Sequence, residues 1–351
     1  MAQLTIRLKG CLEMVPIASN LRHDKLDTVF TEAFFEDAVA LGAPAADVAW
    51  GPELSFLHRL ARSLKAQREV VRGKPENFNR PDYSFKLERD SNDTPPMGDE
   101  TVVIGTRKRG APLDLMVAEA MILANSTWGQ WMAQLGVPGI YRSQASLAPG
   151  VKVRMGTKAL PHAGIGVPSY AWSTSPLRRY TDLVNQWQII ACAKHGATAA
   201  LAAPFKPKDA ELFSIISGFD AAYSAYNSVQ SSMERYWTLR HVQQQGMEEL
   251  DASLVKEMGA GTWLVRADTL PLMFSVMGAN NLPRGARVRV KLSDVDLMAL
   301  DVRGTVIAHL DAEGQADSDE AEQDSEDDDN LPAGPVTIAV DLNDNTPSNA
   351  P

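Results

Sequence analysis

The spacing of hydrophobic positions changes along this chain, and the changes divide it into stretches that predict helices and strands. The opening TIRLKGCLEMVPI alternates like a β-strand and, because a strand needs a partner, it indicates the continuation of a sheet. Helical spacing follows from about Leu26 to Arg72 and again from Pro112 to Leu135. Between them, alternation at 83–87 and in TVVIGTRKRG flanks the turn SNDTPPMGD, which predicts a β-hairpin.

The second half of the chain predicts two further helices and then a β domain. One helix is expected from about Pro176 to Lys194 and a longer one from about Ser214 to Gln245, which Gly246 ends. Residues 261–310 hold short alternating segments separated by Gly and Asn-Asn turns, as in a small barrel of the OB type. The run DSDEAEQDSEDDD cannot bury apolar surface, so residues 311–351 are expected to be a disordered acidic tail.

Charge changes this picture only slightly, because the acidic residues gather at one end. The formal net charge of the 351 residues is -10, but from Asp311 onward there are 13 Asp and Glu and no Lys or Arg. Residues 1–310 therefore carry 34 basic and 31 acidic side chains and are mildly basic. Two cysteines, Cys11 and Cys192, are too few for a disulfide framework, and no window approaches the roughly 18 apolar residues of a membrane span. A cytoplasmic protein without a membrane segment is expected.

The stretch YAWSTSPLRRYTDLVN poses an electrostatic question at the start of the third predicted helix. Ser175 followed by Pro176 predicts an N-cap and a first helical residue, which places Arg178 and Arg179 in the first turn. The positive end of the helix dipole opposes them there by about 0.3–1 kcal/mol each. A negative partner is therefore expected.

Two kinds of negative partner are open for these arginines. A nucleic-acid phosphate fits the free N–H groups and the guanidinium fork, and the rings of Tyr170, Trp172 and Tyr180 offer faces on which bases could stack. The alternative is that Arg178 pairs with Asp182 one turn on, or that both arginines only reach solvent.

The same stretch resembles a known family. TSPLRRYTDL is similar to the TSPIRRYxDL signature of the RNB family, the ribonuclease II and ribonuclease R type of 3′-to-5′ hydrolytic exoribonucleases. The segment HAGIG from His162, the helix VAEAMILAN and the later Met233-Glu-Arg keep the family's order, and an OB-type barrel follows. The resemblance covers residues 1 to about 310. It implies an α+β fold with the C-terminal portion of an RNB catalytic domain at 1–255, an OB-fold RNA-binding barrel at 256–310 and the acidic tail at 311–351.

The resemblance also implies roles for single residues. Arg178 matches the arginine that contacts the scissile phosphodiester, and Glu234 matches a glutamate near the catalytic centre that influences product release. Single-stranded RNA is the implied partner, with Arg179, Ser175 and Glu119 among its contacts. The alternative to a role in RNA binding is an ordinary position on a helix face for Glu119. For Glu234 the alternative to a catalytic role is a solvated position at the boundary of the core.

Helical geometry adds to the hypothesis for Glu234. Five residues fall on one edge of the last predicted helix, where they could line an RNA channel: Tyr223, Tyr226, Gln230, Glu234 and Trp237. One departure from the family lies near the arginines, because Gln186-Trp187 replaces the usual His-Arg after the DL pair. Stacking and packing are both open as roles for Trp187.

Family chemistry further implies magnesium held by aspartates in an order like D-x5-D-x-D-D, and no four-aspartate match to this spacing occurs here. A loose match at Glu320, Glu326, Asp328 and Asp329 lies in the acidic run, where almost any spacing would match. We therefore expect no metal ligands in this chain and no activity from it alone.

Two explanations keep the catalytic hypothesis. The chain would be a truncated product, or its partner would be a separate chain with the missing N-terminal half. The alternatives are a non-catalytic RNA-binding remnant and a protein-interaction module driven by the acidic tail.

Overall fold

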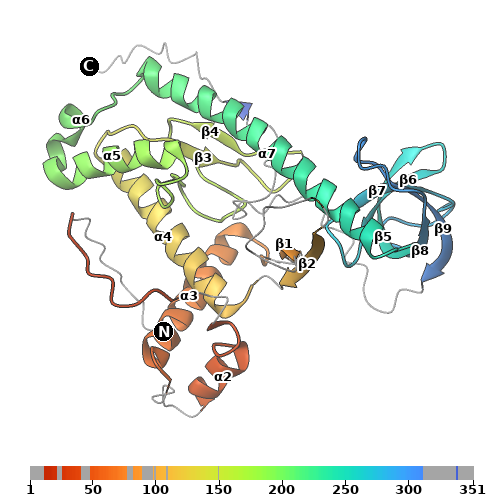
Figure 1. Ribbon diagram of the computed structural model, residues 1–351. Coiled ribbons are helices and arrows are strands. Elements are labelled where there is room, and N and C mark those ends of the chain that lie inside the picture. The colour runs from red at the N-terminus through yellow and green to blue at the C-terminus, as the bar shows by residue number, and fades with distance from the viewer. Residues whose placement is uncertain are drawn as a thin grey trace. The chain divides into compact units, whose positions relative to one another are not determined.

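The structure, a computed structural model, describes most of the chain as two compact units (Figure 1). The described residues are 12–21, 26–40, 48–76, 82–88, 98, 100–107, 110–148, 150–310 and 337–338. The first unit comprises Met1–Asn77, Gly110–Ser224 and Ala333–Pro351, and the second comprises Phe78–Arg109 and Ala225–Pro332. The division falls within one long helix, α7 (Ala210–Gln244).

Helices make up most of the first unit. They are α2 (Glu32–Ala40), α3 (Gly51–Arg72), α4 (Pro112–Gln134), α5 (Tyr180–His195), a 3-10 turn (Gly196–Thr198), α6 (Ala199–Ala202) and the start of α7. Strands β3 (Tyr141–Ser143) and β4 (Arg154–Gly156) pair antiparallel, and β10 (Thr337–Ile338) pairs parallel with β4. Apart from β10, the predicted acidic tail at 311–351 lies outside the described residues.

The long helix α4 has clear local causes. Its first residue is Pro112, whose missing N–H would have no intrahelical partner, and Asp114 lies in its first turn, where the dipole favours a negative charge. Gly136 follows the helix with φ +68°, a conformation that glycine adopts at little cost. Because these signals are local, the helix matches the sequence prediction within a residue.

Apolar side chains of α4 and its neighbours form the core of the first unit. One cluster joins α2, α3 and α4 through Phe30, Phe35, Leu54, Ala61, Leu113 and Met116. A second joins α4, α5 and α7 and includes Ile122, Ile140, Val184, Leu212 and Ile216. A third surrounds the buried thiol of Cys192 on α5.

Burial of Cys192 gives a simple chemical prediction. Desolvation raises the pKa of this thiol to about 11. Since the thiolate is the reactive form, Cys192 in a Cys11→Ser variant should react slowly with Ellman's reagent in native buffer near pH 8 and about 100-fold faster in 8 M urea. Rapid reaction in native buffer would mean that α5 is not packed as described. The raised pKa stabilises the fold below the unfolded thiol's pKa, and this contribution is lost as pH rises through about 11.

The second unit contains a β-hairpin, the rest of α7 and a barrel. Strands β1 (Asp82–Glu88) and β2 (Thr101–Arg107) pair antiparallel, which confirms the predicted hairpin. The barrel strands are β5 (Glu249–Gly259), β6 (Thr262–Ala267), β7 (Met273–Met277), β8 (Arg287–Leu292) and β9 (Arg303–Leu310). They close in the order β5-β6-β7-β9-β8, with β7 and β9 parallel and the other pairs antiparallel.

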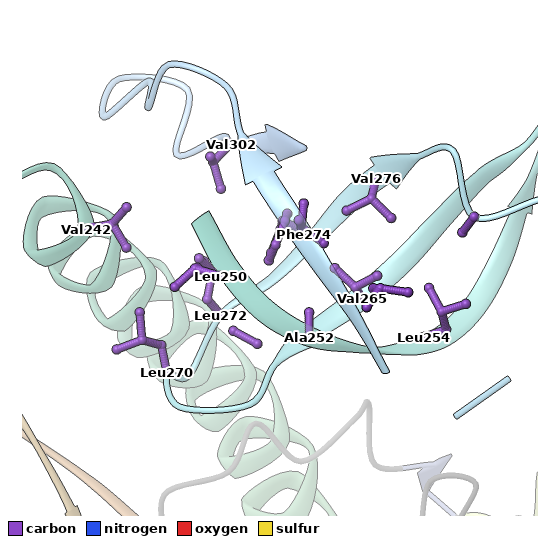
Figure 2. Close-up of a cluster of buried hydrophobic side chains, with 14 of the residues drawn as sticks. Val242, Leu250, Ala252, Leu254, Val265, Leu270, Leu272, Phe274, Val276 and Val302 are labelled. Carbon is purple, nitrogen blue, oxygen red and sulfur yellow. The ribbon is translucent and has the colours of Figure 1, made fainter. Parts of the chain in front are cut away.

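Alternation along the strands fills the barrel. Val265, Phe274, Val276, Val288 and Val290 are buried, while their strand neighbours face outward. The last turns of α7 belong to the same core through Leu239 and Val242, as Figure 2 shows for Val242. A closed barrel of five strands agrees with the OB type predicted from the sequence.

The structure differs from the sequence predictions at two places in the fold. Residues 12–21 form neither helix nor strand, so the strand predicted for the opening is absent there, and residues 1–11 lie outside the described part. In the stretch predicted to be helical from Leu26 to Arg72, the described residues include the helices α2 and α3, as predicted. The barrel begins at Glu249, within the region predicted as catalytic domain, because β5 was not recognised as a strand. Among the described residues, no helix is long and apolar enough to cross a membrane.

Candidate nucleic-acid interface

The chain forms a tight turn immediately before α5, where the sequence predicts the helix to begin. The N–H groups of Arg178 and Arg179 donate to the carbonyl of Ser175 at 3.2 and 3.0 Å. Arg179 has an extended backbone and is the N-cap residue, so α5 begins at Tyr180 and the predicted start at Pro176 is wrong. Ser175 does not cap the helix. Its N–H donates to Oδ1 of Asp182 at 2.9 Å, which closes the turn.

Asp182 is the negative partner of one of the two arginines, Arg179. Its side chain is fully buried and accepts two hydrogen bonds from Arg179, at 3.0 Å from Nε and 2.8 Å from Nη2. The Arg179 guanidinium also lies over the ring of Trp172, with Cζ 4.1 Å from the ring centroid, and Arg142 lies over the same ring at 4.0 Å. An arginine paired with Asp182, one of the two alternatives, is therefore present, and the arginine of this pair is Arg179.

This buried pair leaves the tip of the turn exposed. Leu177 is fully exposed, and the exposed Arg178 contacts the Ser175 hydroxyl from Nη2 at 3.4 Å. Tyr180 is 49% exposed, and its ring meets that of Trp187 edge to face. The turn thus presents a cation and aromatic surface together, which is the chemistry that binds single-stranded nucleic acid.

Polar side chains on the buried face of α5 hold the surrounding loops, and sequence reasoning missed them. Asn185 donates to the carbonyls of Ile140 and Trp172 at 2.8 and 2.7 Å and accepts from the Ile140 N–H at 2.7 Å. Gln188 bonds both backbone groups of Phe205. With Asp182, these residues recur every three positions. This spacing on a helix whose other face carries Tyr and Trp is the signal that could have revealed them.

Two of the aromatic residues predicted to stack on RNA are buried instead. Tyr170 is 5% exposed, accepts a hydrogen bond from Asn125 at 3.2 Å and meets the ring of His162 edge to face. Trp172 is also 5% exposed and packs against Arg142 and Arg179. Their ring faces, and the guanidinium of Arg179, are therefore not the exposed surface that the prediction requires.

Glu119 is likewise buried, at 1% exposure, and its partner is Arg68 of α3. Oε2 accepts from Arg68 Nε at 3.0 Å, and Oε1 contacts Nη2 of the same guanidinium. Arg68 also reaches Glu76 at 2.9 Å. Burial would lower the pKa of Arg68, but the hydrogen bonds and charges of the two carboxylates raise it above its ordinary value. The geometry gives Glu119 a structural role in place of the predicted RNA contact.

Replacing Glu119 by glutamine should lower the free energy of unfolding by about 1–3 kcal/mol, because the buried Arg68 guanidinium loses the carboxylate charge and one of its two acceptor oxygens on residue 119. Urea denaturation measures the loss. RNA affinity of the folded variant should stay unchanged. A variant that is as stable as the wild type but binds RNA less tightly would restore the RNA-contact interpretation.

Glu234, predicted near the catalytic centre, lies on α7 in the second unit. It is partly buried, and Oε1 accepts a hydrogen bond from Gln230 Nε2 at 2.9 Å. On the same predicted edge Tyr226 is 57% exposed, whereas Tyr223 and Trp237 are partly buried. Arg178 belongs to the first unit and Glu234 to the second, so each candidate catalytic residue is described within its own unit.

The magnesium that the resemblance implies would need a group of carboxylates. Within the part of the chain that the structure describes, no three or more His, Cys, Asp or Glu side chains are grouped so that they could hold a metal ion. The described residues therefore do not fit the ion. Each role that is assigned to them rests on the contacts of their own side chains, without a metal ion.

Comparison with protein families gives a match to the first half of the chain. Residues 21–152 and 148–195 match the profile of the family described as RNB domain. Among curated proteins, the chain is 26% identical over 213 residues to an uncharacterized ribonuclease of Synechocystis sp., covering 52% of this chain and 30% of that protein. It is 29% identical over 97 residues to the mitochondrial exoribonuclease DSS-1 of Trypanosoma brucei brucei, covering 24% of this chain and 13% of that protein. The chain thus spans less than a third of these relatives.

Solved structures show the same fold at low identity. An active-site mutant of the Dss1 exoribonuclease from Candida glabrata superposes with a TM-score of 0.59 at 19% identity, over 78% of this chain and 38% of that one. RNase R of Mycoplasma genitalium, in complex with ribose-methylated single-stranded RNA, gives a TM-score of 0.55 at 13% identity, over 78% and 53% of the chains.

Proposed function

We propose that this chain, which belongs to the RNB domain family, binds single-stranded RNA and serves a ribonuclease that hydrolyses it from the 3′ end. The observation that carries the proposal is the exposed Arg178 on a turn fixed by the buried pair of Asp182 and Arg179. A guanidinium held in this way can bind a phosphodiester and stabilise the charge that develops on it during cleavage. The relatives named as ribonucleases and exoribonucleases support the same reaction class.

In this proposal two other candidate residues have secondary roles. Ser175 supports the Arg178 side chain through its hydroxyl, and Glu234, held by Gln230, influences product release. The sequence has no D-x5-D-x-D-D spacing. We therefore propose that the chain by itself binds RNA without rapid hydrolysis and that a further RNB segment carries the magnesium-binding aspartates.

The direct test uses the purified chain, labelled single-stranded RNA and Mg²⁺. Binding should weaken steeply between 50 and 200 mM salt, because lysines and arginines displace counterions from the phosphates. No nucleotides should be released. Binding that is absent even at low salt would show the function to be wrong, and rapid nucleotide release would show that the chain holds a complete catalytic site.

A non-catalytic RNA-binding protein is the second candidate, favoured by the missing aspartate spacing. The two candidates separate when the part of the Synechocystis relative that this chain does not match is added as a second polypeptide. Hydrolysis that appears only in the mixture supports the catalytic assignment. Unchanged binding without hydrolysis at any ratio favours the non-catalytic candidate.

A further inference from the structure

An exposed aromatic pair lies beside the turn that carries Arg178. Tyr180 and Trp187 are seven residues apart on α5, which places them two turns apart on one helix face. They are 49% and 37% exposed, and their ring centroids are 6.2 Å apart at an interplanar angle of 84°. This edge-to-face arrangement lets each ring restrain the other while part of each remains open to solvent.

Packing within the first unit does not account for this exposure. The opposite face of α5 already carries the core contacts, through Val184 and Ile189 and through the buried polar residues Asp182, Asn185 and Gln188. Gln186 turns inward as well, since its amide donates to the carbonyl of Ser173. Trp187 remains on the outer face of the helix with Tyr180.

The chemistry next to the pair selects one kind of ligand. Arg178 is separated from Tyr180 by one residue and is exposed, while the nearby carboxylate of Asp182 is buried and paired with Arg179. An exposed cation next to exposed rings suits a nucleotide, whose phosphate contacts the guanidinium while its base stacks on the ring. A purely apolar protein partner would have to cover the exposed charge of Arg178 as well as the two rings.

We propose that Trp187, supported by Tyr180, stacks on a base of single-stranded RNA next to the phosphate bound by Arg178. The inference rests on the proposed function and adds a residue to it that the family resemblance does not supply, because Gln186-Trp187 stands where the family usually has His-Arg. Base stacking tolerates any sequence, so this site adds affinity without sequence preference.

The experiment is a scan with short single-stranded RNAs, each with one abasic nucleotide at a different position. In the wild type, one position should show a loss of affinity of about 10-fold, typical of one lost stacking contact. Trp187→Leu should weaken binding of the intact RNA by a similar factor and remove the penalty at that position. Trp187→Phe should retain most of both. Trp50→Leu is the matched control, because Trp50 is similarly exposed, at 40%, but precedes α3.

The outcomes separate the inference from the function on which it rests. If Trp187→Leu keeps the wild-type affinity and abasic profile while Arg178→Ala weakens binding, the inference is wrong and the function stands. If the wild type does not bind RNA, both are wrong. A change in oligomeric state in Trp187→Leu with unchanged RNA binding would identify a protein contact and overturn the inference. If Trp187→Leu folds poorly, Tyr180→Leu takes its place. This variant must remove the loss of affinity that the abasic nucleotide causes in the wild type, and a loss that remains would count against stacking.

Discussion

Replacing Asp182 by alanine should lower the free energy of unfolding by about 3–5 kcal/mol, the range found when one partner of a buried ion pair is removed. Asp182 is fully buried, and Arg179 is only 7% exposed, so the variant would leave a desolvated guanidinium without its carboxylate. The N–H of Ser175 would lose its acceptor at the same time. Because both contacts shape the turn that carries Arg178, RNA binding should weaken in the folded fraction too.

Urea denaturation of Asp182→Ala measures this loss, and two further variants test its cause. Glu211→Ala removes an acid from the first turn of α7, where it is exposed, so its loss should stay below about 1 kcal/mol. The double variant Asp182→Leu/Arg179→Met should recover much of the stability, since it replaces the pair with apolar groups. A loss below about 1 kcal/mol in Asp182→Ala would show that water reaches the pair.

The arginine turn shows what sequence reasoning can predict about a site and where it fails. Helix electrostatics predicted an anion beside Arg178 and Arg179, and for Arg179 this anion is Asp182. Helix electrostatics could not decide which residue begins the helix. The carboxylate of Asp182 accepts a hydrogen bond from the N–H of Ser175, and this bond keeps residues 175–179 in a turn. That choice depends on the burial of Asp182, which is a property of the packed unit and not of the local sequence.

Burial also explains the misplaced aromatic residues. Tyr170, Trp172 and Tyr180 are close in sequence and equally able to stack, yet only Tyr180 is exposed. Trp172 is covered by two guanidinium groups, one of which comes from Arg142, a residue far away in sequence. Local composition cannot distinguish a ring that binds a base from one that binds an arginine of its own chain.

The barrel was easier to predict because its signal is local. Strands β7 and β8 have buried residues at alternate positions, and β9 begins with exposed and partly buried residues in alternation, so each is visible within a few residues. β5 was missed because its second half, VKEMG, carries charged residues and only its first half has buried alternate positions. The parallel pairing of β7 with β9 joins strands that are not neighbours in the sequence, so no local pattern predicts it.

Replacing Arg178 by alanine should have the largest effect on function of any single change in this chain. The side chain is exposed and buries little, so the free energy of unfolding should change by less than about 0.5 kcal/mol. Single-stranded RNA should nevertheless bind less tightly, and the salt dependence of binding should fall by about one phosphate contact. In a complete RNB assembly, hydrolysis should fall about 100- to 1,000-fold, as when one stabilising donor is removed from a transition state.

Arg178→Lys separates charge from geometry in the same assays. Lysine keeps the positive charge but loses the planar fork that can bond two phosphate oxygens, so binding should be largely retained while hydrolysis stays low. Arg59→Ala, which removes an exposed arginine from α3, controls for the loss of one positive charge. If Arg59→Ala and Arg178→Ala weaken RNA binding equally, the turn before α5 provides only general electrostatic attraction. If RNA binding is lost selectively in Arg178→Ala and lysine restores it only partly, then binding requires a guanidinium on the turn that Asp182 and Arg179 hold in place.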